Sequence, residues 1–179
     1  MGKNAIGKGY IQVYTGNGKG KTTAALGLAF RAMGRGLRTY VGQFMKGQKY
    51  AELDAAKAVK PYITFDQFGK KDFIHVKNPP RPEDVRMAQE GLAKAHKAMT
   101  AGIYDIVILD EIVTAHYFNL VSLDDMLSFI KNKPDNVELV LTGRYAPQEL
   151  IDAADLVTEM LEVKHYYQKG IASRDGIER

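Results

Sequence analysis

The nine residues from Thr15 to Thr23, Thr-Gly-Asn-Gly-Lys-Gly-Lys-Thr-Thr, have the types and spacing of a phosphate-binding loop. Three glycines within five positions let the backbone curl so that successive N–H groups point at one centre. In such a loop Lys21 reaches phosphate oxygens and the Thr22 hydroxyl binds Mg²⁺. The alternative is a flexible glycine loop without a ligand. An apolar run before the loop and an Ala- and Leu-rich run after it favour the phosphate loop, because that loop joins a strand to a helix.

A second group of candidate residues consists of the carboxylates Asp110 and Glu111, which follow the apolar run 106–109. In parallel α/β sheets, ligands bind outside the carboxyl ends of the strands. The phosphate loop leaves the carboxyl end of its own strand, so both features meet at one edge of the sheet. Carboxylate oxygens are ligands that Mg²⁺ prefers, directly or through water. The alternative is that Asp110 only caps the segment that follows.

Three basic residues are weaker candidates. Arg144 follows another apolar strand, and a guanidinium group binds phosphate oxygens bidentately, although a surface arginine in a turn has the same sequence context. Arg31 lies nine residues after Thr22, and helix geometry turns it away from the Thr22 face. His165 is an isolated histidine, which is more often structural than a ligand.

The residues that must position these groups form alternating strand-like and helix-like segments, which predict an α/β fold with a mainly parallel sheet covered by helices. We expect strands at 10–14, 39–44, 63–68, 106–109, 137–141 and 156–161, and helices at 24–33, 50–59, 82–100, 122–131 and 147–154. Segment 69–82 has no clear period and is the expected substrate loop. Within it, Phe73 stands among charges and is a candidate to face a large apolar ligand.

Composition narrows the class of protein. A chain of 179 residues fits one domain, which we place at 1–179. The net charge of +4 is modest and the charges are mixed, which argues against nucleic-acid binding. The chain has no cysteine, so disulfides and thiolate metal sites are excluded. No signal peptide or membrane-spanning run is evident, and we expect a cytoplasmic protein that binds no membrane.

Taken together and in order, these segments resemble the ATP:corrinoid adenosyltransferases, a family of cobalamin metabolism. The resemblance covers nearly the whole chain. It rests on the loop 16–23, Ala-Leu-Gly-Leu-Ala at 25–29, Gln-Phe-Met-Lys-Gly at 43–47, Tyr-Asp-Ile-Val-Ile-Leu-Asp-Glu at 104–111, Leu-Thr-Gly-Arg at 141–144, Ala-Ala-Asp-Leu-Val-Thr-Glu-Met at 153–160, Lys-His at 164–165 and the glycine-containing tail from 170 to 178. Single pieces such as the phosphate loop are generic, whereas the ordered set is specific.

The resemblance implies a three-layer, RecA-like phosphate-loop fold, usually assembled as a homodimer. It implies transfer of the 5′-deoxyadenosyl group of ATP to Co(I) of a corrinoid, with release of triphosphate. Because Co(I) is the nucleophile, no side-chain nucleophile is expected. An electron-donor flavoprotein or other Co(II) reductase is the implied partner. The alternatives are a phosphate-loop kinase or ATPase acting at the γ-phosphate, and a non-catalytic or nucleic-acid-linked RecA-like module.

The resemblance also assigns roles to residues. The nucleotide-binding set is Gly16, Asn17, Gly18, Lys19, Gly20, Lys21, Thr22, Thr23, Arg31 and Arg144. The expected metal-binding residues are Thr22, Asp110 and Glu111, and Asn17 would contact the ribose. Phe73 and His75 are expected to face the corrinoid, with His75 standing where the family commonly has tryptophan. Thr15 replaces the first glycine of the general phosphate-loop pattern, and we relate it to a cradle that presents C5′ of a reversed ATP.

Overall fold

The computed structural model describes residues 6–70 and 79–178. Its strands are β1 (Ile11–Thr15), β2 (Thr39–Phe44), β3 (Ile63–Phe68), β4 (Ile106–Asp110), β5 (Glu138–Thr142) and β6 (Leu156–Glu159). Its helices are α1 (Lys21–Met33), α2 (Ala51–Ala58), α3 (Pro82–Thr100), α4 (Ile112–Tyr117), α5 (Leu123–Lys131) and α6 (Gln148–Asp152), with a short 3₁₀ helix, η1, at Tyr166–Lys169. The predicted α/β alternation is confirmed.

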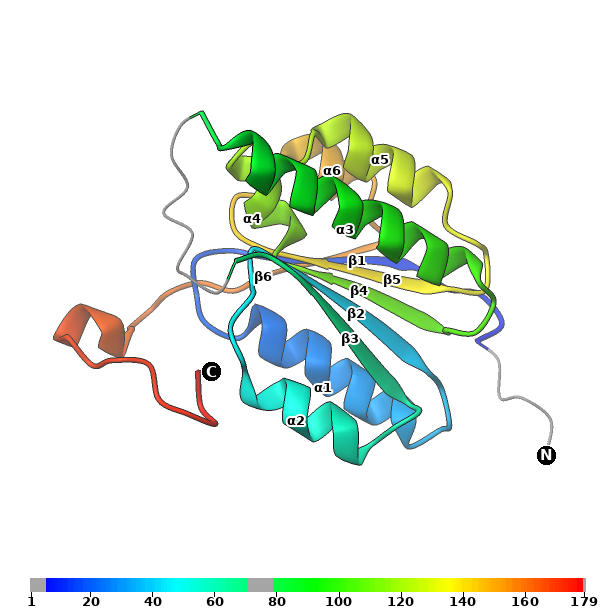
Figure 1. Ribbon diagram of the computed structural model, residues 1–179, viewed down its shortest axis with the longest axis horizontal. Helices are drawn as coiled ribbons and strands as arrows, with labels where there is room; N and C mark the ends of the chain where they lie inside the picture. Colours follow the sequence, from blue (N-terminus) through cyan, green and yellow to red (C-terminus); the bar gives the residue numbers. More distant parts are fainter. Residues whose placement is uncertain (1–5, 71–78, 179) are drawn as a thin grey trace.

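Within the described residues the strands form one parallel sheet in the order β3-β2-β4-β5-β1-β6. Helices α1 and α2 cover one face, and α3 to α6 cover the other (Figure 1). This gives the three layers expected of a RecA-like phosphate-loop fold. The order reverses between β4 and β1, so the carboxyl ends of these strands and of β5 border one crevice.

The two faces of the sheet account for the sequence of its central strand. Ile106 and Ile108 of β4 lie in the core under α1, whereas Val107 and Leu109 lie in the core under α3 to α6. Successive strand residues point to opposite faces, and both faces are covered, so the strand is apolar throughout. Asp110 is the first charged residue along it and lies at the edge where the crevice opens.

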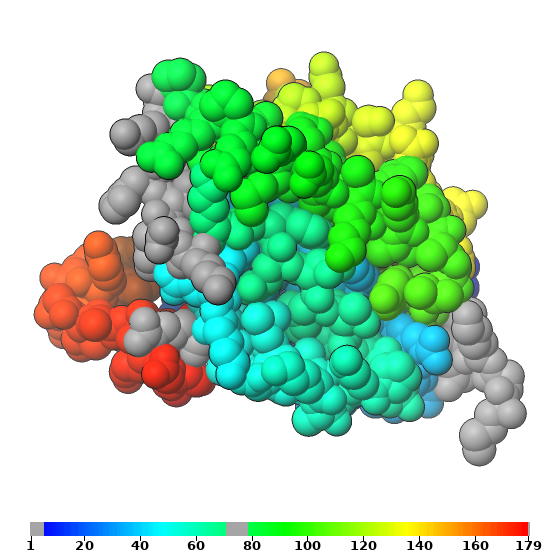
Figure 2. Space-filling view, viewed as in Figure 1, coloured from blue at the N-terminus to red at the C-terminus, as the bar shows by residue number. Residues whose placement is uncertain are grey.

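The chain after β6 departs from the compact body. Residues 161–178 form a lobe that projects from the side of the molecule (Figure 2). This lobe carries η1. Its large apolar side chains are exposed, with Val163 at 87% and Tyr167 at 77%. The lobe therefore contributes little to the core. Its contacts with the crevice are described with the candidate site below.

Two elements were not predicted from the sequence. Helix α4 has six residues and begins directly after Glu111, and η1 has four residues. The predicted strand at 156–161 ends at Glu159, where the chain leaves the sheet. Other element boundaries differ from the prediction by up to three residues, the largest shift being the start of α1 at Lys21, inside the expected phosphate loop.

Candidate nucleotide site

The glycine loop connects the end of β1 to the start of α1, as the sequence predicts. Gly20 is the N-cap residue of α1 and has φ 124°, and Gly16 has φ 93°. Both values lie in the region that side-chain-bearing residues avoid, so glycine is required at these two positions. Because the loop ends at the N-terminus of α1, it lies at the positive end of the helix dipole, where phosphate groups bind in other proteins.

The loop is supported from behind by the chain leaving β6. The Gly18 amide donates to the Met160 carbonyl at 2.7 Å, and the Met160 amide donates to the Thr15 carbonyl at 2.9 Å. A Cβ atom at Gly18 would lie 2.7 Å from the carbonyl oxygens of Met160 and Leu161. Glycine at position 18 thus allows the backbone of the loop to lie close to the backbone of the chain after β6.

Thr15, the departure from the general loop pattern, has a defined place. It is buried, and its Oγ1 accepts a hydrogen bond from the Ala146 amide at 3.3 Å. The threonine side chain therefore ties the start of the loop to the segment after β5. The relation of Thr15 to the orientation of ATP stays a prediction.

Lys21 is folded back onto its own loop. Its Nζ donates to the carbonyls of Gly16 at 2.7 Å and Gly18 at 2.8 Å. Burial has the largest effect on this ammonium and lowers its pKa below the ordinary value; Arg144 acts in the same direction, against Glu111 and Asp110. A phosphate group would replace the carbonyl partners with charged acceptors, which form stronger hydrogen bonds.

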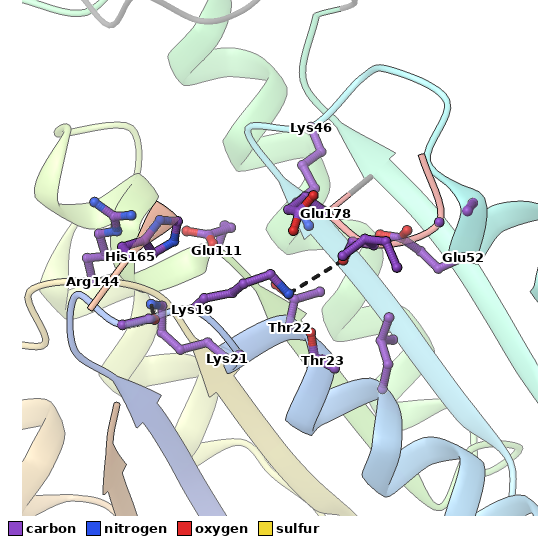
Figure 3. A pocket seen from close by; sticks show the side chains of 16 residues that line it. Lys19, Lys21, Thr22, Thr23, Lys46, Glu52, Glu111, Arg144, His165 and Glu178 are labelled. Atoms are coloured by element: carbon purple, nitrogen blue, oxygen red, sulfur yellow. Dashed lines mark hydrogen bonds between the residues drawn. The ribbon is translucent and has the colours of Figure 1, made fainter. Parts of the chain in front are cut away.

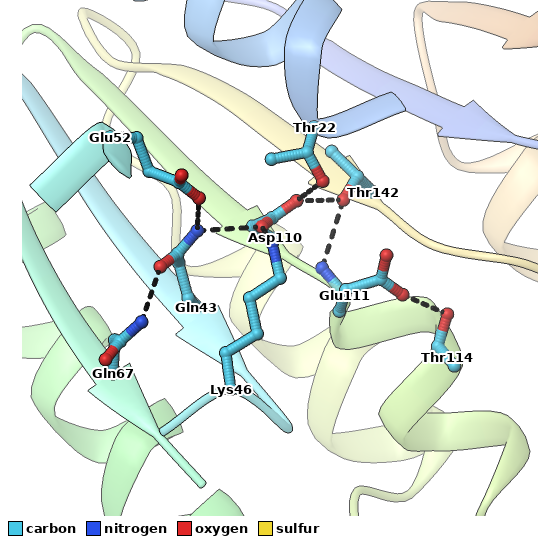
Figure 4. A network of polar contacts seen from close by, with 9 residues as sticks. All are labelled: Thr22, Gln43, Lys46, Glu52, Gln67, Asp110, Glu111, Thr114 and Thr142. Atoms are coloured by element: carbon cyan, nitrogen blue, oxygen red, sulfur yellow. Dashed lines mark hydrogen bonds and ion pairs between the residues drawn. The ribbon is translucent and has the colours of Figure 1, made fainter. Parts of the chain in front are cut away.

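Asp110 is the centre of a buried polar network (Figure 4). Its Oδ1 accepts from the hydroxyls of Thr22 and Thr142, each at 2.8 Å. Its Oδ2 accepts from Gln43 Nε2 at 3.2 Å and from Lys46 Nζ at 2.8 Å. The side chain is only 1% exposed, so these partners compensate the cost of burying the charge.

Lys46, on the segment after β2, is the cation of this network. Its side chain is 15% exposed. Burial alone would lower the pKa of Lys46, but the charge and hydrogen bond of Asp110, with smaller contributions from Glu52 and Glu111, outweigh burial and raise it. Lys46 therefore stays protonated beside the carboxylate.

Glu111 adopts a left-handed backbone with φ 62°, uncommon for a residue with a side chain. Its amide donates to Thr142 Oγ1 at 3.0 Å, and its carboxylate accepts from Thr114 Oγ1 at 2.5 Å. The same Thr114 oxygen accepts the Arg144 amide at 2.9 Å. Glycine at position 143 allows the backbone beside Arg144 to lie this close to Thr114, because a Cβ there would be 2.5 Å from the Thr114 amide nitrogen. Thr114 thus links the backbone of the arginine to the carboxylate.

These features surround a pocket of about 420 Å³ (Figure 3). The charged and hydroxyl side chains labelled in Figure 3 come from the phosphate loop and α1, from α2, from the segments after β2, β4 and β5, and from the C-terminal lobe. The lining residues are Gly18, Lys19, Gly20, Lys21, Thr22, Thr23, Leu26, Lys46, Ala51, Glu52, Glu111, Arg144, His165, Gly176, Ile177 and Glu178.

Hydrogen bonds within the C-terminal tail hold its last residues beside the pocket. The Arg174 amide and guanidinium donate to Glu178, and the Tyr166 hydroxyl also contacts this carboxylate. The hydrogen bonds from Arg174 and Tyr166 lower the pKa of Glu178 to about 2. Lys19 Nζ lies 3.5 Å from the Ile177 carbonyl, which connects the tail to the phosphate loop.

The structure brings most of the predicted site residues together. Residues 18–23, Glu111 and Arg144 line the pocket, and Asp110 lies behind Thr22. Arg31 lies in the last turn of α1, away from the lining residues, as helix geometry indicated. Gly16 contacts Met160 and, like Asn17, is not among the lining residues. Phe73 and His75 lie outside the described residues.

Residue-by-residue reasoning missed three contributions to the pocket: Lys46, Glu52 and the end of the tail. Lys46 and residues 176–178 belong to segments that carried the family resemblance, which was the available signal. Glu52 lies in an ordinary amphipathic run and had no such signal.

The donor set suits Mg²⁺. The Thr22 hydroxyl, the Asp110 carboxylate and, across the pocket, the Glu111 carboxylate supply oxygen atoms, which this ion prefers over nitrogen or sulfur. Within the described residues, no cluster of three or more histidine, cysteine or acidic side chains has the arrangement of a metal site formed by protein alone. Mg²⁺ usually binds through one or two protein groups together with substrate phosphates.

The sheet order, the glycine loop at the start of α1 and the carboxylates after β4 define the class, an α/β protein with a RecA-like phosphate-loop fold. Residues 7–179 match the family described as ATP:corrinoid adenosyltransferase BtuR/CobO/CobP. The chain therefore belongs to this family of transferases, as its sequence motifs indicated.

Three relatives of the chain are each described as a corrinoid adenosyltransferase. The chain is 35% identical to the one from Sinorhizobium sp, with 96% of this chain and 80% of the relative covered. It is 33% identical to the one from Pseudomonas aeruginosa, with coverage of 96% and 84%. It is 30% identical to the one from Escherichia coli K12, with coverage of 96% and 86%. Within the described residues, no helix is long and apolar enough to cross a membrane.

Proposed function

We propose that this protein binds ATP in the described pocket and transfers its 5′-deoxyadenosyl group to Co(I) of a corrinoid, releasing triphosphate. The observation that carries the proposal is which segments of the chain supply the residues that line the pocket. They come from segments spread over residues 18 to 178, within the span that matches the family. They place Lys19, Lys21, Lys46 and Arg144 around the space in front of the phosphate loop, together with the carboxylates of Glu52, Glu111 and Glu178. A site for a polyanionic leaving group needs such a distribution of charge.

The reaction balances without a nucleophile from the protein. The Co(I) electron pair forms a bond to C5′ of the ribose, the C5′–O bond breaks, and its electron pair leaves on the triphosphate. Lys21 and Arg144 would stabilise the negative charge of the departing group. The bound Mg²⁺ would be held by Thr22 with Asp110 or Glu111 and would neutralise part of that charge. Positioning and charge stabilisation are thus the main contributions of the chain.

The test is anaerobic incubation with ATP, Mg²⁺ and cob(I)alamin. We expect the visible spectrum of an alkylated cobalt and one triphosphate for each adenosylated product. Formation of ADP without a cobalt–carbon bond would contradict the proposal and support the kinase or ATPase alternative.

Further parts of the proposal concern the surroundings of the enzyme. We expect a homodimer, a flavoprotein or other reductase that supplies Co(I), and a cytoplasmic location. Nucleotide contacts of Arg31 and Asn17 also belong to the proposal. Sedimentation at several protein concentrations tests the dimer, and the Kd of ATP for Arg31→Ala tests the arginine.

A further inference from the structure

The segment after β2 holds Lys46 in a fixed place. Met45 has a left-handed backbone with φ 57°, and its amide donates to the Phe68 carbonyl at 2.9 Å. A Cβ at Gly47 would lie 2.3 Å from the Gly69 carbonyl oxygen, and one at Gly69 would lie 2.6 Å from the Lys46 amide nitrogen. The segments after β2 and β3 therefore contact each other through glycines on both sides, which fixes the backbone of Lys46.

This backbone directs the Lys46 side chain toward Asp110, at the wall of the pocket (Figure 4). Its Nζ lies 2.8 Å from Asp110 Oδ2 and 5.0 Å from the centre of the Tyr50 ring. An ammonium group has three N–H donors, and the Asp110 bond requires one of them. The position is thus suited to a second anionic partner in the pocket.

Asp110 has other partners besides Lys46. Thr22 and Thr142 donate to its Oδ1, and Gln43 donates to its Oδ2. If a metal ion binds beside Thr22, it competes with the ammonium for the same carboxylate. A polyphosphate in the pocket would at that point offer Lys46 a new acceptor.

We propose that Lys46 is a second phosphate-binding lysine, paired with Asp110 in the free protein and turning to polyphosphate oxygens when the nucleotide and its cation bind. This inference rests on the proposed function, in which the leaving group is a triphosphate. Lys21 approaches the anion from the phosphate loop, and Lys46 approaches it from the segment after β2. The exchange would let Asp110 keep a cationic partner in both states.

The experiment measures the Kd of inorganic triphosphate by calorimetry in excess Mg²⁺, because the cation is what frees Lys46 from Asp110 in the proposed exchange. We expect Lys46→Met to weaken binding about 10- to 100-fold, as for the loss of a hydrogen bond to a charged group. Lys57→Met is the matched control, because Lys57 is exposed and pairs with Asp54; it should bind like wild type. Unchanged binding by Lys46→Met would overturn the proposal.

A second comparison separates phosphate binding from mere neutralisation of Asp110. The double variant Lys46→Met with Asp110→Asn leaves neither charge of this pair buried without its partner, so we expect it to fold even if the single variant does not. We expect it to bind triphosphate more weakly than Asp110→Asn alone. Equal binding by these two variants would show that Lys46 only balances Asp110, and would overturn the proposal. The adenosyl-transfer assay of wild type tests the proposed function separately from either result.

Discussion

At the scale of single residues, hydrogen bonds from threonine hydroxyl groups position the charged side chains of the site. Thr22 and Thr142 bond to Asp110, and Thr114 bonds to Glu111 and to the Arg144 amide. Hydroxyl groups both donate and accept, so one side chain can connect a carboxylate to a backbone amide. The positions of the charged groups therefore depend partly on Thr114 and Thr142, which are not among the residues that line the pocket.

Replacing Lys21 with Ala tests the central phosphate contact. Lys21 is expected to exchange its two carbonyl partners for phosphate oxygens. We expect the Kd of ATP, measured by calorimetry, to rise about 10- to 100-fold. Lys57→Ala, a change at an exposed lysine, should leave the Kd unchanged. A Lys21→Ala variant that binds ATP like wild type would contradict the site assignment.

Replacing Thr114 tests the link between Glu111 and Arg144. Thr114→Val has a similar shape but lacks the hydroxyl, which leaves the Arg144 amide and one Glu111 oxygen without this partner. We expect a loss of about 1–3 kcal/mol in the free energy of unfolding, measured in urea, together with weaker ATP binding. Thr114→Ser keeps the hydroxyl and should retain the affinity for ATP. If serine and valine gave equal affinities, the link would have no role in the site.

At the scale of elements, packing decides what a glycine contributes to a helix. Gly27 in α1 and Gly91 in α3 both lie in the interior of a helix. A Cβ at Gly27 would meet no atom within 4 Å, whereas one at Gly91 would lie 2.4 Å from Cγ of Phe68. Gly91 thus lets α3 approach β3, and Gly27 has no such role.

The two helical glycines predict opposite effects on stability. Gly27→Ala should raise the free energy of unfolding by up to about 1 kcal/mol, because alanine restricts the unfolded chain. Gly91→Ala should lower it by about 1–3 kcal/mol, because the methyl group collides with Phe68. Urea unfolding of both variants measures the difference. Effects of the same sign would mean that helix propensity alone governs both sites.

At the scale of the whole molecule, the C-terminal lobe lies outside the body formed by the sheet and its covering helices (Figure 1). Its residues 176–178 and His165 nevertheless line the pocket. Its exposed apolar residues contribute little to folding, whereas residues 176–178 border the phosphate loop. Stability and ligand binding should therefore respond differently to its removal.

A chain truncated after Glu162 tests this separation. We expect thermal unfolding without ligand to stay close to that of the full chain. We expect the Kd of ATP to rise about tenfold, which corresponds to roughly 1.4 kcal/mol of lost contact. Glu178→Gln in the full chain is the milder companion variant. A truncated chain that binds ATP with unchanged affinity would show that the lobe is no part of the site.

Much of this molecule could be predicted from local sequence. The strands, the longer helices, the phosphate loop and the carboxylates after β4 have signals within a few consecutive residues, since apolar runs and glycine spacing are local properties. Helix α4 was missed because six residues are too few for a helical period. The hydrogen bond between Thr15 and Ala146 was not predicted because the two residues are distant in sequence.

The sequence by itself determined that the chain has a phosphate loop, a parallel α/β fold and the motifs of its family, because each is encoded in contiguous residues. Only the tertiary structure decided that Lys46 pairs with Asp110 and that residues 176–178 reach the pocket. These contacts join segments 64 or more residues apart. The sheet order places β2 beside β4 and β6 beside β1, which brings the segments that follow these strands to one edge of the sheet. Sequence spacing cannot reveal that order, because long-range strand pairing sets it.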